Sequence, residues 1–170
     1  MDVACEALKR DGFPVWRVKG FEADDLIATA VSHAAQIPDT SVLIASSDKD
    51  LLQLVSERVT CKSLRDGKEF DAAAVVEKFK VTPEQILDYL CLVGDKSDNI
   101  KPARGMGPKT AAALEKTWPT LPPKYEHVRD RIEAAYQVAH LPRSRKDPRV
   151  AGLIKFPLRA RLRQGWPSDA

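Results

Sequence analysis

The spacing of apolar positions in the first 70 residues alternates between the periods of helices and strands. From Glu22 to Gln36 the apolar residues recur every three or four positions behind an acidic first turn, which predicts an amphipathic helix. Further helices are expected at 3–10 and 48–55, and the short apolar runs 14–18, 41–45 and 59–64 are typical of strands. Asp66-Gly67 predicts a turn into a short return strand. This alternation predicts a parallel α/β sheet, with 41–45 as a buried strand.

Beyond residue 70 the pattern becomes helical. Asp71 is a predicted N-cap, and Thr82 followed by Pro83 marks another helix start. The predicted helices are 72–79, 86–93, 108–116 and 125–139, with turn formers at 94–107. From residue 141 onward Pro, Arg and Lys are scattered without a period. We therefore expect an α/β part (1–70), a helical part (71–140) and a basic tail of low order (141–170).

Composition narrows the class of protein. With 170 residues, 44% of them hydrophobic, the chain can bury one core of ordinary size. No apolar run approaches the roughly 20 residues of a membrane span, and the first residues do not resemble a secretory signal. Cys5, Cys61 and Cys91 are isolated from one another and from His, so we interpret them as reduced packing residues rather than ligands. A cytoplasmic protein is the expectation.

Charge is distributed unevenly along the chain. The net charge is +3, but eight basic residues against Asp147 and Asp169 give residues 141–170 a charge of +6, which leaves −3 for residues 1–140. A polyanionic partner would explain a basic tail on an acidic body. A solvated tail would explain it too, and composition does not choose between the two.

Acidic residues gather at three junctions between predicted elements. Glu22, Asp24 and Asp25 open a helix, Asp48 and Asp50 follow the strand 41–45, and Asp95 and Asp98 follow the helix 86–93. The first two clusters would share the carboxyl edge of a parallel sheet, where open α/β folds place their sites. Crowded carboxylates repel one another unless a cation lies among them, and oxygen ligands without His or Cys favour Mg²⁺ or Mn²⁺ over Zn²⁺. Any single cluster could instead complement a helix N-terminus. Together they favour two-metal phosphodiester chemistry.

A second candidate site is the turn that precedes the helix predicted at 108–116. Gly105 and Gly107 would present backbone N–H groups to a phosphate, and Lys109 adds a positive charge in the first helical turn. The turn is not a Walker loop, because position 102 is Pro, and it is not a dinucleotide-binding fingerprint, because position 110 is Thr. Taken alone, such a turn is as often structural as functional.

Long motifs in this order resemble a known family. GFEADDLIA (20–28), SSDKDLLQLV (46–55), VTPEQILDYLCLVGDKSDNI (81–100) and GMGPKTAAALE (105–115) are similar to the 5′→3′ exonuclease domain of bacterial DNA polymerase I and to its free-standing flap-endonuclease relatives. The resemblance runs from about residue 3 to 135. It implies a partial Rossmann-like sheet, followed by a helical region with a helix-hairpin-helix near 95–116.

The resemblance also implies roles for individual residues. Seven carboxylates would hold two Mg²⁺ or Mn²⁺ ions that hydrolyse DNA phosphodiesters: Glu22, Asp24, Asp25, Asp48, Asp50, Asp95 and Asp98, with Asp48 and Asp50 as the catalytic pair. The hairpin residues Gly105, Met106, Gly107, Pro108, Lys109 and Thr110 would grip the duplex backbone. Relatives also bind K⁺ through backbone carbonyls, at positions that match Leu92, Val93, Lys101, Ala103 and Met106. The expected partner of this monomer is duplex DNA with a 5′ flap or 5′ end.

Departures from the family pattern define the alternatives. Relatives begin with a strand that carries an essential Asp, followed by a basic arch, and this chain starts after both, so we expect a truncated form with exposed strand edges. Pro102 stands in the K⁺ loop where relatives have Gly, which predicts an altered loop. Residues beyond 140 do not resemble the family. The chain is therefore either a 5′-nuclease or a catalytically impaired DNA-binding remnant that cleaves far more slowly than full-length relatives. A small phosphate-ester hydrolase is disfavoured by the hairpin.

Overall fold

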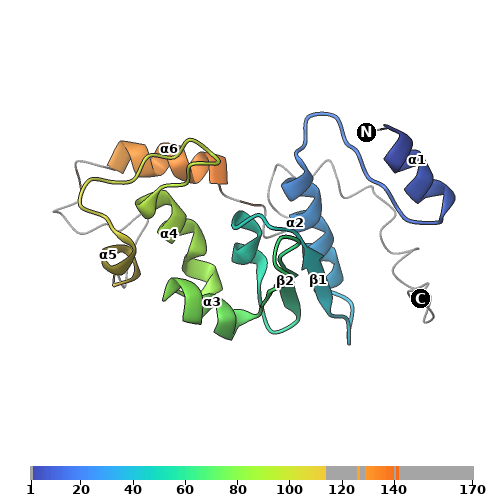
Figure 1. The fold of residues 1–170 in the computed structure, drawn as a ribbon, viewed down its shortest axis with the longest axis horizontal. Helices are drawn as coiled ribbons and strands as arrows, with labels where there is room; N and C mark the ends of the chain where they lie inside the picture. The colour runs from blue at the N-terminus through green and yellow to red at the C-terminus, as the bar shows by residue number, and fades with distance from the viewer. Residues whose placement is uncertain (1, 114–125, 127–128, 140, 142–170) are drawn as a thin grey trace.

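The fold combines a small α/β unit with a group of helices beside it (Figure 1). The structure, a computed structural model, describes residues 2–113, 126, 129–139 and 141. The sheet has the order β1-β2-β3, formed by β1 (Val42–Ala45), β2 (Val59–Lys62) and β3 (Glu69–Phe70). β1 pairs parallel to β2 from Val42↔Val59 to Ala45↔Lys62, and β3 returns antiparallel to β2. The sheet is therefore mixed, and β1 forms one of its edges.

The helices of the α/β unit start where the sequence places acidic residues. α1 (Asp2–Arg10) lies at one end of the molecule in Figure 1. α2 (Ala23–Ala34) begins at Glu22 with a capping box, in which the Glu22 and Asp25 side chains each accept a backbone N–H of the first turn. The 3₁₀ helix η1 (Asp50–Leu54) directly follows β1 and leads into β2. The sequence thus brings the starts of α2 and η1 close to the carboxyl end of β1.

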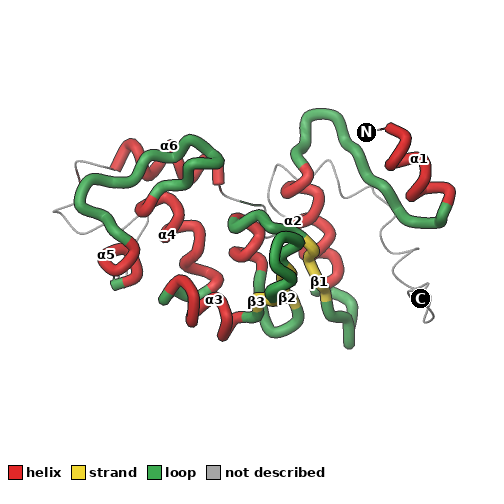
Figure 2. The backbone as a smooth tube through the Cα atoms, viewed as in Figure 1, coloured by secondary structure: helices red, strands yellow, loops and turns green. Residues whose placement is uncertain are grey.

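The helical part is built from α3 (Ala72–Phe79), η2 (Pro83–Gln85), α4 (Ile86–Val93), α5 (Pro108–Ala112) and α6 (Arg129–Ala139) (Figure 2). Asp71 caps α3 as predicted, with its carboxylate accepting the Ala74 N–H at 2.7 Å. Thr82 and Gln85 form a capping box around Pro83, so α4 starts with one turn of 3₁₀ helix. These local signals fix where α4 begins, and α4 leads directly into the loop that carries Asp95.

Two clusters of buried side chains form the core. The first joins α2, the sheet, η1, α3 and part of α4, and its fully buried members include Leu51, Val75 and Ile86. The second joins α4, α5 and α6, and includes Leu92 and Ile132. Leu141, just beyond α6, is buried in the first cluster rather than the second. The chain therefore returns from the helical part to the α/β unit. No helix among the described residues is long and apolar enough to cross a membrane.

The side of β1 opposite β2 has no strand partner among the described residues, and an apolar groove lies between β1 and α2. It has a volume of about 390 Å³, and its lining includes Trp16, Leu26, Ile27 and Leu43. No strand in the described part of the chain pairs with this side of β1, and Leu43 is 58% exposed. The expectation of an exposed strand edge therefore holds for the described residues.

The structure corrects several predictions of local structure. Residues 14–18 form no strand: Pro14 has no N–H to donate, and the segment pairs with none of the described strands. The segment 48–55 forms a short 3₁₀ helix rather than an α-helix. In β1 only Ile44 is buried, because one side of the strand faces the groove. The predicted continuation of α5 to residue 116, the start of the last helix and the tail 142–170 lie outside the described residues.

Candidate metal centre

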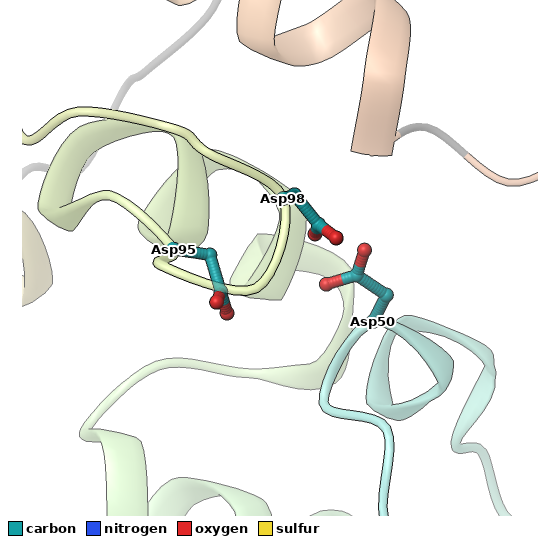
Figure 3. A group of neighbouring side chains, drawn as sticks. All are labelled: Asp50, Asp95 and Asp98. Carbon is teal, nitrogen blue, oxygen red and sulfur yellow. The ribbon is translucent and has the colours of Figure 1, made fainter.

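Carboxylates from both parts of the molecule meet in one place (Figure 3). Asp50 is the first residue of η1, just after the carboxyl end of β1. Asp95 and Asp98 lie in the loop after α4, where Gly94 ends the helix with a positive φ of 81°. In Figure 3 the Asp50 and Asp98 carboxylates face each other, and Asp95 lies on the same loop as Asp98. The meeting point depends on the packing of η1 against the helical part.

The three carboxylates lie close enough together to hold a cation. Asp50, Asp95 and Asp98 each offer one oxygen, and the three atoms lie within 4.8 Å of one another. Asp50 and Asp95 are buried, at 9% and 5% exposure, whereas Asp98 is exposed. Three acidic groups at this separation, two of them shielded from water, are costly unless a positive charge or a proton lies between them.

Burial and neighbouring acidic groups strongly raise the pKa of Asp50. Burial, the charges of Asp98 and Asp48 and a hydrogen bond to Asp98 together raise the pKa of Asp50 to about 7, with burial the largest cause. At neutral pH a proton therefore remains on Asp50 for much of the time when no cation is bound. A divalent cation would replace that proton.

Asp95, in contrast, is held in its ionised form. Burial by itself raises its pKa, but hydrogen bonds from Lys49 and from the Ser97 side chain and backbone outweigh burial and hold the pKa of Asp95 below its usual range. Lys49 Nζ contacts Asp95 Oδ2, and the Ser97 N–H donates to Asp95 Oδ1 at 2.9 Å. Asp95 is therefore an ionised carboxylate with a fixed orientation, which suits a metal ligand.

The cluster at the start of α2 divides between two roles. Glu22 and Asp25 form the capping box, in which the Glu22 N–H donates to Asp25 Oδ2 at 3.3 Å. Asp24 instead feels the other acids: burial raises its pKa, and the charges of Asp48, Glu22, Asp25 and Asp98 add to the effect. Asp48 also accepts the Asp50 N–H at 3.0 Å. Asp24 and Asp48 therefore belong to the same electrostatic neighbourhood as Asp50 and Asp98.

Of the seven carboxylates predicted as metal ligands, the structure brings three into one ligand group and places two beside it. Asp50, Asp95 and Asp98 form the group, Asp24 and Asp48 interact with it, and Glu22 and Asp25 cap α2. The donors are all carboxylate oxygens, with no His or Cys among the three, and their mutual repulsion calls for a positive charge. This arrangement fits a hard divalent cation such as Mg²⁺ or Mn²⁺.

The predicted hairpin forms a turn between α4 and α5. Gly105 has a φ of 80°, Gly107 is the N-cap of α5 and Pro108 takes its first helical position. Lys109 and Arg104 are exposed, whereas the Met106 side chain is buried in the second cluster at 5% exposure. Met106 therefore offers a ligand its backbone only.

Backbone contacts order the start of the same loop. The Ala103 N–H donates to the Leu92 carbonyl at 2.9 Å, and the Met106 N–H donates to the Ala103 carbonyl at 2.9 Å. Two of the five carbonyls predicted to bind K⁺ thus already accept a hydrogen bond from the protein. The Ile100 N–H also donates to the Asp95 carbonyl at 2.7 Å, so the loop closes on itself.

Three residues that shape the site were not identified from sequence. Lys49 holds Asp95, and its position between two acids was the available signal. Gly94 permits the turn into Asp95, and a side chain there would meet the Pro102 backbone nitrogen at 2.6 Å. Gln53, one turn along η1 from Asp50, donates to the Ala139 carbonyl of α6, and nothing in the local sequence predicts that contact.

Comparisons with known proteins agree on one family. The family model described as "5'-3' exonuclease, N-terminal resolvase-like domain" matches residues 1–80, and "5'-3' exonuclease, C-terminal SAM fold" matches residues 81–151. A 5′-3′ exonuclease of Aquifex aeolicus is 45% identical over 113 residues, 66% of this chain and 39% of the relative. DNA polymerase I of Treponema pallidum is 45% identical over 126 residues, 72% of this chain and 12% of the relative. The chain thus spans about two fifths of the first relative and about an eighth of the second.

Solved structures share the fold. A structure of the bacteriophage T5 5′-exonuclease with divalent metal ions (zinc) has a TM-score of 0.68 at 24% identity, and covers 80% of this chain and 56% of its own. A complex of the bacteriophage T5 flap endonuclease with DNA and metal ions has a TM-score of 0.60 at 24% identity, and covers 79% of this chain and 52% of its own.

Proposed function

The chain belongs to the 5′-3′ exonuclease family, and from this premise we propose that it binds DNA beside a divalent-metal centre and hydrolyses phosphodiester bonds at 5′ ends or 5′ flaps. The observation that carries the proposal is the convergence of Asp50, Asp95 and Asp98 within 4.8 Å, from two parts of the fold. A purely structural role would not require three acidic groups, two of them buried, to share one space.

The ligands of two Mg²⁺ or Mn²⁺ ions would come from the whole acidic group. Asp50, Asp95 and Asp98 would form one site, and Asp24 and Asp48, with Glu22 and Asp25 at their side, would contribute to the second. Bound divalent ions polarise a phosphate and lower the pKa of a coordinated water. The bacteriophage T5 structures, which hold metal ions on the same fold, support this assignment.

The side chains of this protein have distinct tasks in that reaction. Asp95 is ionised and oriented by Lys49 and Ser97 before any ligand arrives. Asp50 would give up its proton on binding a divalent ion, so binding at neutral pH would release protons. With Asp48, whose carboxylate already accepts the Asp50 N–H, it forms the proposed catalytic pair.

DNA would be held by the helical part. The hairpin residues 105–110 present two glycines and the exposed cation Lys109 at the start of α5, and Arg104 and Lys101 are exposed beside them. Such groups contact phosphates rather than base edges, so binding would not depend on sequence. Residues 1–70 would thus carry most of the metal ligands, and residues 71–140 would bind DNA as a monomer. The carbonyls of Leu92, Val93, Lys101, Ala103 and Met106 are the proposed K⁺ ligands.

Calorimetry tests the metal centre directly. We expect the wild-type chain to show a heat of Mn²⁺ binding. The Asp48→Ala/Asp50→Ala variant should not show it, because it lacks the central carboxylates. Glu57→Ala/Glu77→Ala removes the same charge from two exposed positions in segments that carry none of the proposed ligands, and serves as the matched control. Negligible, equal heats for the wild type and the Asp48/Asp50 variant would contradict the proposed centre.

A cleavage assay tests the reaction. With Mg²⁺ or Mn²⁺, a DNA substrate with a 5′ flap should be cut by the wild-type chain and left intact by Asp50→Ala, which also excludes a contaminating nuclease. Metal-dependent DNA binding without cleavage would instead identify the chain as a DNA-binding member of the family with impaired hydrolysis. Cleavage that survives Asp50→Ala would contradict the assignment of the catalytic pair.

A further inference from the structure

Gln53 connects the two parts of the protein that supply the carboxylates. Its side chain, in η1, is 3% exposed and uses both ends of its amide. Nε2 donates to the Ala139 carbonyl at 3.0 Å, and Oε1 accepts the Leu141 N–H at 3.2 Å. These contacts join residues 86 and 88 positions apart in sequence. Both ends of the amide therefore hold the backbone where the chain leaves α6.

The geometry of η1 links Gln53 to the metal centre. In a 3₁₀ helix, side chains three positions apart lie on the same side of the helix. Asp50 and Gln53 are separated by three positions in η1, so the residue that faces Asp98 and the residue that holds the end of α6 lie on the same side of η1. The orientation of η1 about its axis therefore sets both contacts together.

The other carboxylates are tied to α6 through α4. Ile132, Ala135 and Ala139 of α6 pack into the second cluster with Leu87 and Cys91 of α4. Asp95 and Asp98 directly follow α4 in the loop closed by the Ile100 N–H and the Asp95 carbonyl. A continuous path of packed and hydrogen-bonded groups thus runs from Gln53 through α6 and α4 to the carboxylates that face Asp50.

We propose that Gln53 is a positioning residue that holds Asp50 at ligand distance from Asp95 and Asp98, and thereby sets the affinity of the metal centre. The role rests on the proposed metal-binding function. When Asp50 is ionised and no cation is bound, the carboxylates repel one another, which favours separation of η1 from the loop that carries Asp95 and Asp98. The two buried hydrogen bonds of Gln53 oppose that separation. The carboxylates are therefore already in place before a metal ion binds.

The test is Mn²⁺ calorimetry on Gln53→Leu at a temperature where circular dichroism shows it folded. The substitution keeps the side chain buried and apolar and removes both hydrogen bonds. We expect Mn²⁺ to bind about tenfold more weakly, the lower end of the loss that follows removal of a group orienting a metal ligand. Gln53→Asn keeps the amide but shortens its reach, should lose several-fold in affinity by the same argument, and decides the matter if Gln53→Leu does not fold.

A matched control separates positioning from stability. Val75→Ala removes volume from a fully buried position of the first cluster, on α3, away from the carboxylates. It should lower the melting temperature and leave Mn²⁺ affinity within twofold of wild type. If the affinity falls equally in Val75→Ala and in the Gln53 variants at equal melting temperature, stability rather than positioning is responsible and the proposal is overturned.

A second variant tests the route of the effect. Adding Gln53→Leu to Asp98→Asn should weaken Mn²⁺ binding by less than it does in the wild-type background, because one of the carboxylates to be positioned is already gone. Wild-type affinity in Gln53→Leu, or an equal loss in both backgrounds, would overturn the role of Gln53 while leaving the metal centre intact. A wild-type chain that binds no Mn²⁺ would instead overturn the metal centre and this role together.

Discussion

Asp50 makes the stability of the metal-free protein depend on pH in an unusual direction. The unfolded chain releases this proton near the ordinary pKa of 3.8, whereas the folded protein keeps it to about pH 7. Between these values the folded state binds more protons than the unfolded state, so the free energy of unfolding falls as pH rises. Asp95, whose pKa is lowered, acts in the opposite sense but only below its ordinary pKa of 3.8.

Urea denaturation in the presence of a chelator, at several pH values from 4.5 to about 7.5, measures this effect. The wild type should lose stability across the range. Asp50→Asn should be less sensitive to pH, because its neutral amide has no proton to release. Added Mg²⁺ should offset the loss in the wild type, since the cation replaces the proton. If the free energy of unfolding depends on pH in the same way in both proteins, titration of Asp50 is not the cause of the loss of stability.

The residue types predicted the chemistry of the site, but not which carboxylates cap a helix and which belong to the acidic group. The acidic positions and the preference for a hard cation followed from the sequence. Glu22 and Asp25 cap α2, while the Asp24 carboxyl interacts electrostatically with Asp48. This division depends on the rotation of the helix start, which single-residue propensities do not specify. The partnership of Lys49 with Asp95 spans 46 positions and exists only after folding.

At the scale of elements, the turn that ends α4 depends on one glycine. Gly94 has a φ of 81°, and a Cβ there would lie 2.6 Å from the Pro102 nitrogen and 2.7 Å from the Ile100 carbonyl oxygen. Both obstacles are backbone atoms of the loop that carries Asp95 and Asp98, so they cannot rotate away. Gly94→Ala should therefore destabilise the protein by about 2–4 kcal/mol and weaken Mn²⁺ binding.

Gly67→Ala is the matched control for this substitution. Gly67 has a similar φ of 70°, but a Cβ there meets nothing within 4 Å. Its cost should be backbone strain alone, about 1 kcal/mol, with Mn²⁺ affinity unchanged. Urea denaturation and calorimetry of the two variants measure the difference. Equal losses of unfolding free energy in the two variants would mean that the loop after α4 can shift to accept a Cβ. The close approach of Pro102 would then not be a constraint.

Elements with strong local signals were predictable, and elements that depend on a neighbour were not. The period of α2, the Asp71 cap and the Asp66-Gly67 turn each act within a few residues, and the structure has them close to the predicted places. Residues 14–18 have a strand-like composition, but a strand also needs a partner, and Trp16 instead lines the groove beside β1. η1 is helical as expected, yet only five residues long and of the tighter 3₁₀ type.

For the whole molecule, the proposed DNA contacts predict a salt-dependent affinity without sequence preference. Lys109→Ala removes one exposed cation at the start of α5, so duplex binding should weaken and the slope of log affinity against log salt should fall by about one or less. Lys9→Ala is the control, because α1 lies at the opposite end of the molecule from α5 (Figure 1). Fluorescence anisotropy at several salt concentrations measures both. An unchanged slope and affinity in Lys109→Ala would show that the hairpin does not contact DNA.

The packing of the α/β part against the helical part was the feature that was hardest to predict from the sequence. Periodicity separates an α/β part from a helical part, but it does not state how they pack. The ligand group needs Asp50 and Asp98 to approach across 48 positions, and Leu141 to return to the first cluster. The positions of the acidic clusters suggested a shared site, and the resemblance to a known family placed Asp50 and Asp98 in it. How the two residues approach each other was not predictable, because long-range packing is decided by the whole core rather than by any segment.

The open edge of β1 has a consequence for how the protein behaves in concentrated solution. Edge strands with exposed apolar side chains are templates for intermolecular pairing, and Leu43, 58% exposed beside an apolar groove, offers such a template. Above a threshold concentration, molecules should associate edge to edge and scatter light on warming. Leu43→Lys places a gatekeeper charge on that edge and should delay the onset of scattering without lowering Mn²⁺ affinity. Val76→Lys, at an exposed apolar position on α3, should not. Equal onset in all three proteins would locate the aggregation-prone surface away from β1.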